Sequence, residues 1–262
     1  MDLDSKSFSK LIRVSAHDRN LSNVSETAEK FRVGVPGYSR EFGRLLASQV
    51  VSCHITHTFY NVDVYSKQFV FTTPGDSQVH TITMTEGQYS STEYLDHLIA
   101  LIDAELSSSN AYSIDQNTQK ITLTFSEDIK LTPSISQNPV AVNLGFGLNE
   151  IEYASSSSII TAPYVINLAG PNSVYIHCRQ LSAGTSDFDT PADVHSILEV
   201  PLDQPFGSVC RYQASDAMAG LIRYRNARSI DELEFRVRDS RGRLLNCQDV
   251  DWSIIIKIYY GA

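Results

Sequence analysis

The chain has 262 residues, of which 42% are hydrophobic and only 19% are charged, and its formal net charge is −9 at pH 7. This length allows one large all-β domain, or one domain with an insertion, around a sizeable buried core. The acidic balance argues against a general binder of nucleic acid or of anionic membranes, which would need a dense basic face.

Neither export nor membrane insertion is indicated by the sequence. No window approaches the 18 apolar residues of a membrane span, and residues 1–10 lack the apolar core of a signal peptide. Cys53, Cys178, Cys210 and Cys247 are scattered without a C-x-x-C pair, and three of them fall in strand-like apolar runs. These features predict synthesis in a reducing compartment, the cytoplasm of the cell that makes the protein.

Most of the chain is predicted to form short strands separated by turn residues. Residues 11–36 read as two strand-like segments joined by a polar elbow, Ser-Ala-His-Asp-Arg-Asn, at residues 15–20. Residues 44–64 form a long β-branched and aromatic stretch, and residues 68–76 end in Pro-Gly-Asp. Residues 79–87 then alternate at period two and stop at a glycine, as a half-buried strand does.

A helix and a hairpin follow and predict a separate α+β unit. Apolar residues recur at helical spacing at Leu95, Leu98, Ile99, Ile102 and Leu106. Ser90 and Glu93 predict a capping box at the start of this helix. Residues 111–115 and 120–126 are predicted to pair as a hairpin, and residues 134–147 to close the unit. We expect the unit to span residues 85–160 and to end in a serine-rich linker at residues 155–158.

The pattern of strands returns after residue 160 and continues to the C-terminus. Leu233, Phe235 and Val237 alternate with charged residues, and residues 239–242 read as a turn. The prediction is therefore a mainly β sandwich made of residues 1–84 and 161–262, interrupted by a small α+β domain at residues 85–160. A sandwich of this kind must pair early strands with late ones, which closes edges that would otherwise invite aggregation.

Metal or catalytic chemistry finds no pattern in the sequence. His54 and His57 lie three apart in a predicted strand, so they point to opposite faces and do not share a metal without a bulge. The other histidines lack the spacing of zinc ligands, and no G-x-S-x-G elbow is present. We therefore predict no catalytic, cofactor-binding or metal-ligating residues, no cofactor and no enzyme activity.

Two binding functions stand as alternatives. Seven arginines gather late in the chain, at Arg223, Arg225, Arg228, Arg236, Arg238, Arg241 and Arg243. Because Glu and Asp are interleaved among them, ion-paired strands are favoured over a phosphate site. A carbohydrate-binding or receptor-binding module remains open, since jelly rolls include lectins. However, the aromatic residues mostly alternate within strands, as core residues do.

Several short motifs, in one order, resemble a known family. V-S-x-x-D-R-N at residues 14–20 leads to F-x-V-x-V-P at 31–36 and to H-T-F-Y-N-V at 57–62. T-I-T-M-T-E-G-Q-Y-S-S-x-x-Y-L at 81–95 and N-L-G-F at 143–146 follow. Together they resemble the penton, or vertex, minor capsid proteins of virophages, polinton-like viruses and related eukaryotic DNA viruses.

The resemblance implies a fold, an assembly and a location. It implies a single jelly roll with an inserted domain, of which five copies form a homopentamer at each vertex of an icosahedral double-stranded DNA virus. The partners implied are trimers of a double-jelly-roll major capsid protein and a host surface receptor that the insertion contacts, without direct contact to nucleic acid. The location implied is the virion. A minor capsid protein away from the vertex remains an alternative.

In this setting the elbow is interpreted as architectural. Asp18 and Asn20 are residues that hold turns through hydrogen bonds to their own backbone. His17 and Arg19 are predicted to pin the turn and to lie partly buried against an adjacent subunit. We therefore name His17, Asp18, Arg19 and Asn20 as the candidate subunit or capsid contact.

Overall fold

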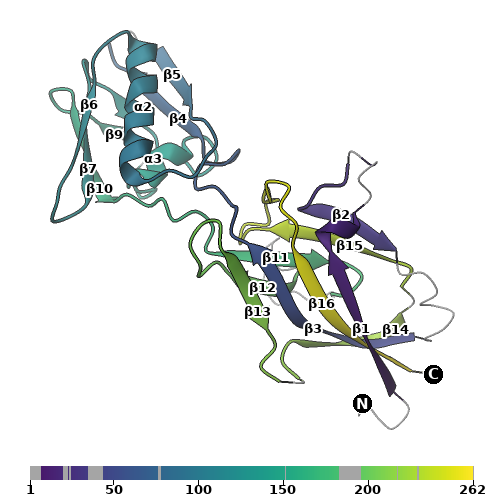
Figure 1. Cartoon of the computed structure of the whole chain (residues 1–262). Helices are drawn as coiled ribbons and strands as arrows, with labels where there is room; N and C mark the ends of the chain where they lie inside the picture. Colours follow the sequence, from purple (N-terminus) through teal and green to yellow (C-terminus); the bar gives the residue numbers. More distant parts are fainter. Residues whose placement is uncertain are drawn as a thin grey trace. The chain divides into compact units, whose positions relative to one another are not determined.

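The computed structural model describes residues 7–19, 23, 25–34, 44–75, 78–150, 152–182, 196–216, 218–228 and 230–261. The chain divides into two compact units (Figure 1). The first, hereafter the β unit, is Met1–Phe59 with Pro171–Ala262, and the second, the inserted unit, is Tyr60–Gly170. Within the described ranges, no helix is long and apolar enough to cross a membrane.

The first sheet of the β unit is antiparallel and joins the two ends of the chain. Its order is β1, β16, β3, β13, with β14 pairing further along β3. The strands are β1 (Ser7–Ser15), β16 (Ser253–Gly261), β3 (Arg44–Thr56), β13 (Val209–Gln213) and β14 (Leu221–Arg228). β1 and β16 pair over nine residues without a register shift. The predicted pairing of early with late strands is thus confirmed.

The second sheet of the β unit is also antiparallel, in the order β12, β11, β15, β2. Its strands are β12 (Ser196–Pro201), β11 (Ser173–Cys178), β15 (Glu232–Arg238) and β2 (Lys30–Gly34). In β15 the apolar residues Leu233, Phe235 and Val237 are buried, and the charged residues between them are not, as the alternation predicted.

One hydrophobic core joins the inner faces of these two sheets. Trp252, just before β16, lies 5.6 Å from Phe31 of β2 and 6.0 Å from Phe235 of β15, measured between ring centroids. The indole N–H of Trp252 donates to the carbonyl of Ala28 at 2.7 Å, so its polar group is satisfied although buried. Two sheets that share one core in this way form a β-sandwich.

The path of the chain through the sandwich defines the fold. β1 lies in the first sheet, β2 in the second, β3 in the first, β11 and β12 in the second, β13 and β14 in the first, β15 in the second and β16 in the first. The connections cross repeatedly between the sheets, and the first and last strands are neighbours. This is the strand order of a jelly roll, so the predicted fold class is confirmed.

The inserted unit packs one long helix and two small sheets around its own core. One sheet has the order β10, β7, β6, and the other has the order β5, β4, β8, β9. These elements are β4 (Gln68–Thr73), β5 (Gln78–Thr83), α2 (Ser91–Leu106), β6 (Ala111–Ile114), β7 (Lys120–Thr124), β8 (Lys130–Leu131), α3 (Pro139–Asn143), β9 (Tyr153–Ala154) and β10 (Ile159–Val165). The predicted helix and hairpin are both confirmed.

The start of α2 shows why this segment is helical. The Ser90 hydroxyl accepts from the backbone N–H of Glu93 at 3.3 Å, and the Glu93 carboxylate accepts from the Ser90 N–H at 2.9 Å. This is the predicted capping box, and it satisfies N–H groups that the first turn cannot bond internally. Leu95, Leu98 and Ile102 are buried along one face of the helix.

The predicted boundaries of the inserted unit need correction. The unit extends over residues 60–170 and not over 85–160. Phe69 and Phe71 of β4 belong to the same buried cluster as Leu98 of α2 and Ile160 of β10, separate from the core of the β unit. Strands of both units alternate at period two, so the sequence pattern alone could not assign β4, β5 and β10 to either core.

Residues 155–158 are likewise not a linker. They connect β9 to β10 inside the inserted unit, and Ser157 and Ser158 both have positive φ, 54° and 62°. Asp128 fixes this connection, since its carboxylate accepts from the Ser158 N–H at 2.6 Å. The low-complexity stretch is therefore a tight turn held by hydrogen bonds.

Candidate assembly surface

The elbow that follows β1 is a single turn of 3-10 helix at Ala16–Asp18. The Ser15 hydroxyl accepts from the His17 N–H at 3.2 Å, and the Asp18 carboxylate accepts from the Ser15 N–H at 2.9 Å. Ala16 is buried, and its N–H donates to the Trp252 carbonyl at 2.8 Å. Asp18 therefore holds the turn through the local backbone, as predicted for its residue type.

Arg19 is the most buried charged side chain of the elbow, with 7% of its side chain exposed. Its guanidinium donates to the carboxylates of Asp249 at 2.7 Å and Asp251 at 2.5 Å, and to the Ala16 carbonyl at 2.6 Å. Burial by itself lowers the pKa of Arg19, but the hydrogen bonds and charges of the two aspartates outweigh it and raise the pKa. The cation is thus held firmly in its charged form.

The predicted subunit contact also includes His17 and Asn20. His17 is exposed over 76% of its side chain, and its Nδ1 lies 3.3 Å from Asp251. Asn20 lies outside the described residues. Arg19 finds its partners within its own chain, so its burial needs no neighbouring subunit, and the exposed His17 is the member that is available to one. No sequence pattern pointed to Asp249 and Asp251, because they are distant from the elbow in the chain.

The next question is whether the described residues could bind a metal or act as a nucleophile. Across the described part of the chain, no three His, Cys, Asp or Glu side chains come together as a metal-ligand set. All four cysteines are buried and free, and burial raises the pKa of Cys53 and of Cys178 to about 12. Thiols with so high a pKa carry almost no thiolate at neutral pH and are poor nucleophiles.

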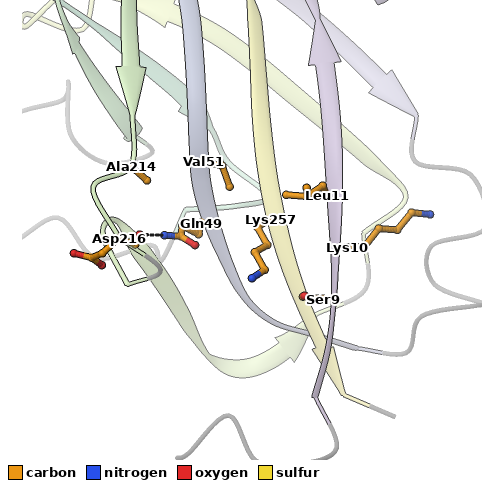
Figure 2. Close-up of a pocket in the computed structure, with 8 residues that line it drawn as sticks. All are labelled: Ser9, Lys10, Leu11, Gln49, Val51, Ala214, Asp216 and Lys257. Atoms are coloured by element: carbon orange, nitrogen blue, oxygen red, sulfur yellow. Dashed lines mark hydrogen bonds between the residues drawn. The ribbon is translucent and has the colours of Figure 1, made fainter.

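An open groove of about 640 Å³ lies on the outer face of the first sheet. In Figure 2, Leu11 of β1 and Val51 of β3 point toward each other across β16, and the Lys257 side chain extends from β16 toward β3. Gln49 donates to the carbonyls of Asp216 at 3.0 Å and Ala219 at 2.9 Å, which fixes the loop at the rim. An open surface of mixed polarity suits a protein partner better than a small ligand, which is usually enclosed.

Comparison with known proteins gives two structural likenesses. No family model and no curated protein matches the chain. Among solved structures, it is similar to the mavirus penton protein, with 9% identity and a TM-score of 0.46 over 98% of this chain and 100% of that one. It is also similar to a chain in the structure of the Sputnik virophage, with 9% identity and a TM-score of 0.45 over 98% of each chain.

One of these structures is of a penton protein and the other is of a virophage, and both terms belong to the family that the sequence motifs resemble. Because both TM-scores lie below 0.5, no functional step rests on these two likenesses. The jelly-roll fold follows from the strand order given above, and jelly rolls occur in viral capsid proteins, lectins and cupins. The sequence motifs and their positions in the two units are what distinguish among these three classes of protein.

Proposed function

We propose that this protein is a structural capsid protein that forms homopentamers at the five-fold vertices of an icosahedral double-stranded DNA virus. The observation that carries the proposal is the jelly roll with a second compact unit inserted between β3 and β11. This architecture is what the family of the sequence motifs implies, and the strand pairing supports it independently of those motifs.

The motifs sit where they would maintain such an architecture. H-T-F-Y-N-V at residues 57–62 spans the boundary between the units: Phe59 is in the core of the β unit, whereas Val62 is in the core of the inserted unit. In N-L-G-F, Phe146 is fully buried in the inserted unit. Their burial in the two cores supports a role in the two-unit architecture that the proposal requires.

The location of the aromatic side chains weakens the carbohydrate-binding alternative. Phe31, Phe235 and Trp252 are in the core of the sandwich and at most 2% exposed. A sugar-binding site needs aromatic faces that a ligand can reach, and these three rings are inaccessible to one. A lectin would have to use exposed rings such as Phe8, Tyr164 and Phe206, and none of these belongs to the sequence motifs.

The proposed assembly fixes the partners and the place of the protein. A ring of five uses heterologous contacts that close by rotation, so each subunit offers two different surfaces to its neighbours. The pentamer would sit among trimers of the major capsid protein in the virion, after synthesis in the host cytoplasm. The inserted unit would meet the host, where a receptor is its proposed partner.

The mass of the purified protein in solution tests this proposal. Sedimentation equilibrium is expected to give about 145 kDa, five copies of the 29.1 kDa chain, either alone or with the major capsid protein present. Immunogold labelling of particles is expected at the vertices. A monomer that is also absent from particles would refute the proposal, and labelling spread over the facets would place the protein away from the vertex.

A further inference from the structure

The two sheets of the sandwich differ sharply in charge. The sequence has thirty Asp and Glu residues, yet none of them lies in β1, β3, β13, β14 or β16, the five strands of the first sheet. The same strands contain eight basic residues: Lys10, Arg13, Arg44, Arg211, Arg223, Arg225, Arg228 and Lys257. In an acidic chain, this absence of carboxylates from one sheet is a local reversal of charge.

The strand register places four of these basic residues on the outer face. Val14, Cys210, Tyr224 and Ile256 point into the core, so their neighbours Arg13, Arg211, Arg223 and Lys257 point outward. We call the outward side of the first sheet the cationic face. Its other side chains are hydroxyl, amide, histidine and apolar ones, and Leu11 is 60% exposed.

The second sheet provides the contrast. On its outer face Arg236 pairs with Glu234, and Arg32 lies 3.4 Å from Glu234 and 3.9 Å from Glu232. The expectation of ion-paired arginine strands therefore holds here. In the described part of the chain, no carboxylate pairs with Arg13, Arg211 or Lys257 of the cationic face.

Asp216, an acidic residue that lines the groove, is bonded to its own turn. The Asp216 carboxylate accepts from the backbone N–H groups of Met218 at 2.7 Å and Ala219 at 2.8 Å, and these bonds lower its pKa. It therefore serves as the cap of its own turn. Arg13, Arg211 and Lys257 therefore remain available to a carboxylate from outside the chain.

Granting the proposed capsid function, we infer that the cationic face docks an acidic, partly apolar surface of a different capsid protein. The face has the composition of a protein interface, in which arginine and tyrosine are enriched beside apolar contacts. Leu11 and Val51 line its groove, and Tyr259 lies beside them under the Lys257 ammonium at 5.0 Å. Opposite charges on the two partners would speed their encounter and fix their register.

Two other occupants are less well supported. A nucleic-acid face depends on many phosphate contacts, whereas the described side chains of this face include four outward basic ones separated by apolar ones. In a second copy, four carboxylates of the β unit are already bonded to their own chain: Asp18, Asp239, Asp249 and Asp251. The inserted unit of a second copy is acidic, but in the proposed assembly this unit meets the host and not the sheet of a neighbour. The test therefore distinguishes self-association from partner binding.

The test reverses the charge of the face in the full-length protein. The variant Arg13→Glu/Arg211→Glu/Lys257→Glu is compared with Lys120→Glu/Arg179→Glu/Arg241→Glu, which makes the same charge change elsewhere. The neutral variant Arg13→Gln/Arg211→Gln/Lys257→Gln controls for folding. The fluorescence of the single tryptophan and the circular dichroism of α2 check all three variants. The probes are the purified major capsid protein trimer of the same virus and a 20-base-pair DNA duplex.

Binding to the trimer is expected to weaken by about tenfold or more in the face-reversal variant, and to be unchanged in the control. Pentamer mass is expected to stay the same in every variant.

Unchanged trimer binding by the folded face variants overturns the inference, as does a wild type that does not bind the trimer. Loss of the pentamer assigns the face to a second copy, and DNA binding abolished by the reversal assigns it to phosphates; either result overturns it too. Failure of the proposed function appears separately, as a wild type that is monomeric and absent from particles.

Discussion

The guanidinium of Arg19 donates a 2.7 Å hydrogen bond to the carboxylate of Asp249, which lies 230 residues further along the chain. Arg19 follows β1 and Asp249 precedes β16, the first and last strands, which pair over nine residues. One buried side chain therefore joins the first and last strands of the jelly roll at the end of the sheet where β1 stops and β16 begins.

Replacing Arg19 is expected to destabilise the β unit. Arg19→Ala should lower the free energy of unfolding by about 1–3 kcal/mol. The cost stays moderate because Asp249 and Asp251 are 81% and 41% exposed, so water can solvate them once the cation is gone. Arg32→Ala is the control, since its side chain is 55% exposed beside two glutamates. Equal losses of unfolding free energy in the two variants would show that the buried ion pairs of Arg19 stabilise the protein no more than those of an exposed arginine.

The chain offers separate probes for its two units. Trp252 is the single tryptophan of the sequence and lies buried in the β unit. The long helix α2 lies in the inserted unit. Urea unfolding followed by tryptophan fluorescence therefore reports on the β unit, and circular dichroism at about 222 nm reports mainly on the inserted unit. Each variant below is measured with both probes.

Asn61→Ala is expected to destabilise the inserted unit by about 2–4 kcal/mol. The buried Asn61 amide donates to the carbonyls of Tyr89 at 2.8 Å and Leu168 at 3.2 Å, and its oxygen accepts from the Tyr89 N–H at 3.0 Å. The substitution leaves these backbone groups without their partner. The helical signal should be lost at lower urea while tryptophan fluorescence stays unchanged; a shift in the fluorescence transition alone would contradict this assignment.

Gly145→Ala is expected to cost the inserted unit about 2–4 kcal/mol. Gly145 has φ of 95°, and a Cβ there would lie 2.3 Å from the carbonyl oxygen of Tyr164. Gly75→Ala is the matched control in the same unit, because a Cβ at Gly75 meets nothing within 4 Å. The control should change stability by about 0.5 kcal/mol or less. Comparable losses in both variants would argue against a steric origin.

Excision of the inserted unit should leave the jelly roll folded. Asn61 bonds Leu168, so the two connections lie side by side, and a short Gly/Ser linker can replace residues 60–170. The product is expected to keep the native emission of Trp252. Excision of residues 85–160 is the comparison: it leaves Phe69 and Phe71 without their core, and this product should aggregate. If the product without residues 60–170 aggregates and the product without residues 85–160 stays soluble, the boundaries predicted from the sequence are correct.

The inserted unit is expected to lose stability in acid. Hydrogen bonds from the backbone and side chain of Ser90 hold the pKa of Glu93 below its usual 4.5 in the folded state. The unfolded state therefore binds more protons, so this contribution is complete above pH 4.5 and is lost as the pH falls through the folded pKa. Glu93→Gln should unfold with a weaker dependence on acid than the wild type. An unchanged acid dependence would show that Glu93 does not contribute.

The features that could be predicted from the sequence depend on residues that are close together in the chain. The helix and its cap could be predicted because Ser90 and Glu93 interact three residues apart, and the β6–β7 hairpin because its strands are five residues apart. The class of sandwich also followed, since alternation at period two appears wherever one strand face is buried. The turn at Asp18 was predicted from its residue type alone.

Only the tertiary structure decided which strands share a core and which charges share a face. β4, β5 and β10 have the same alternation as the strands of the jelly roll, and only packing assigns them to the inserted unit. Arg19 meets Asp249, and the carboxylate-free strands assemble into one cationic face, only after strands from both ends of the chain have paired. The physical reason is that these relationships depend on non-local pairing, whereas residue patterns record only local geometry.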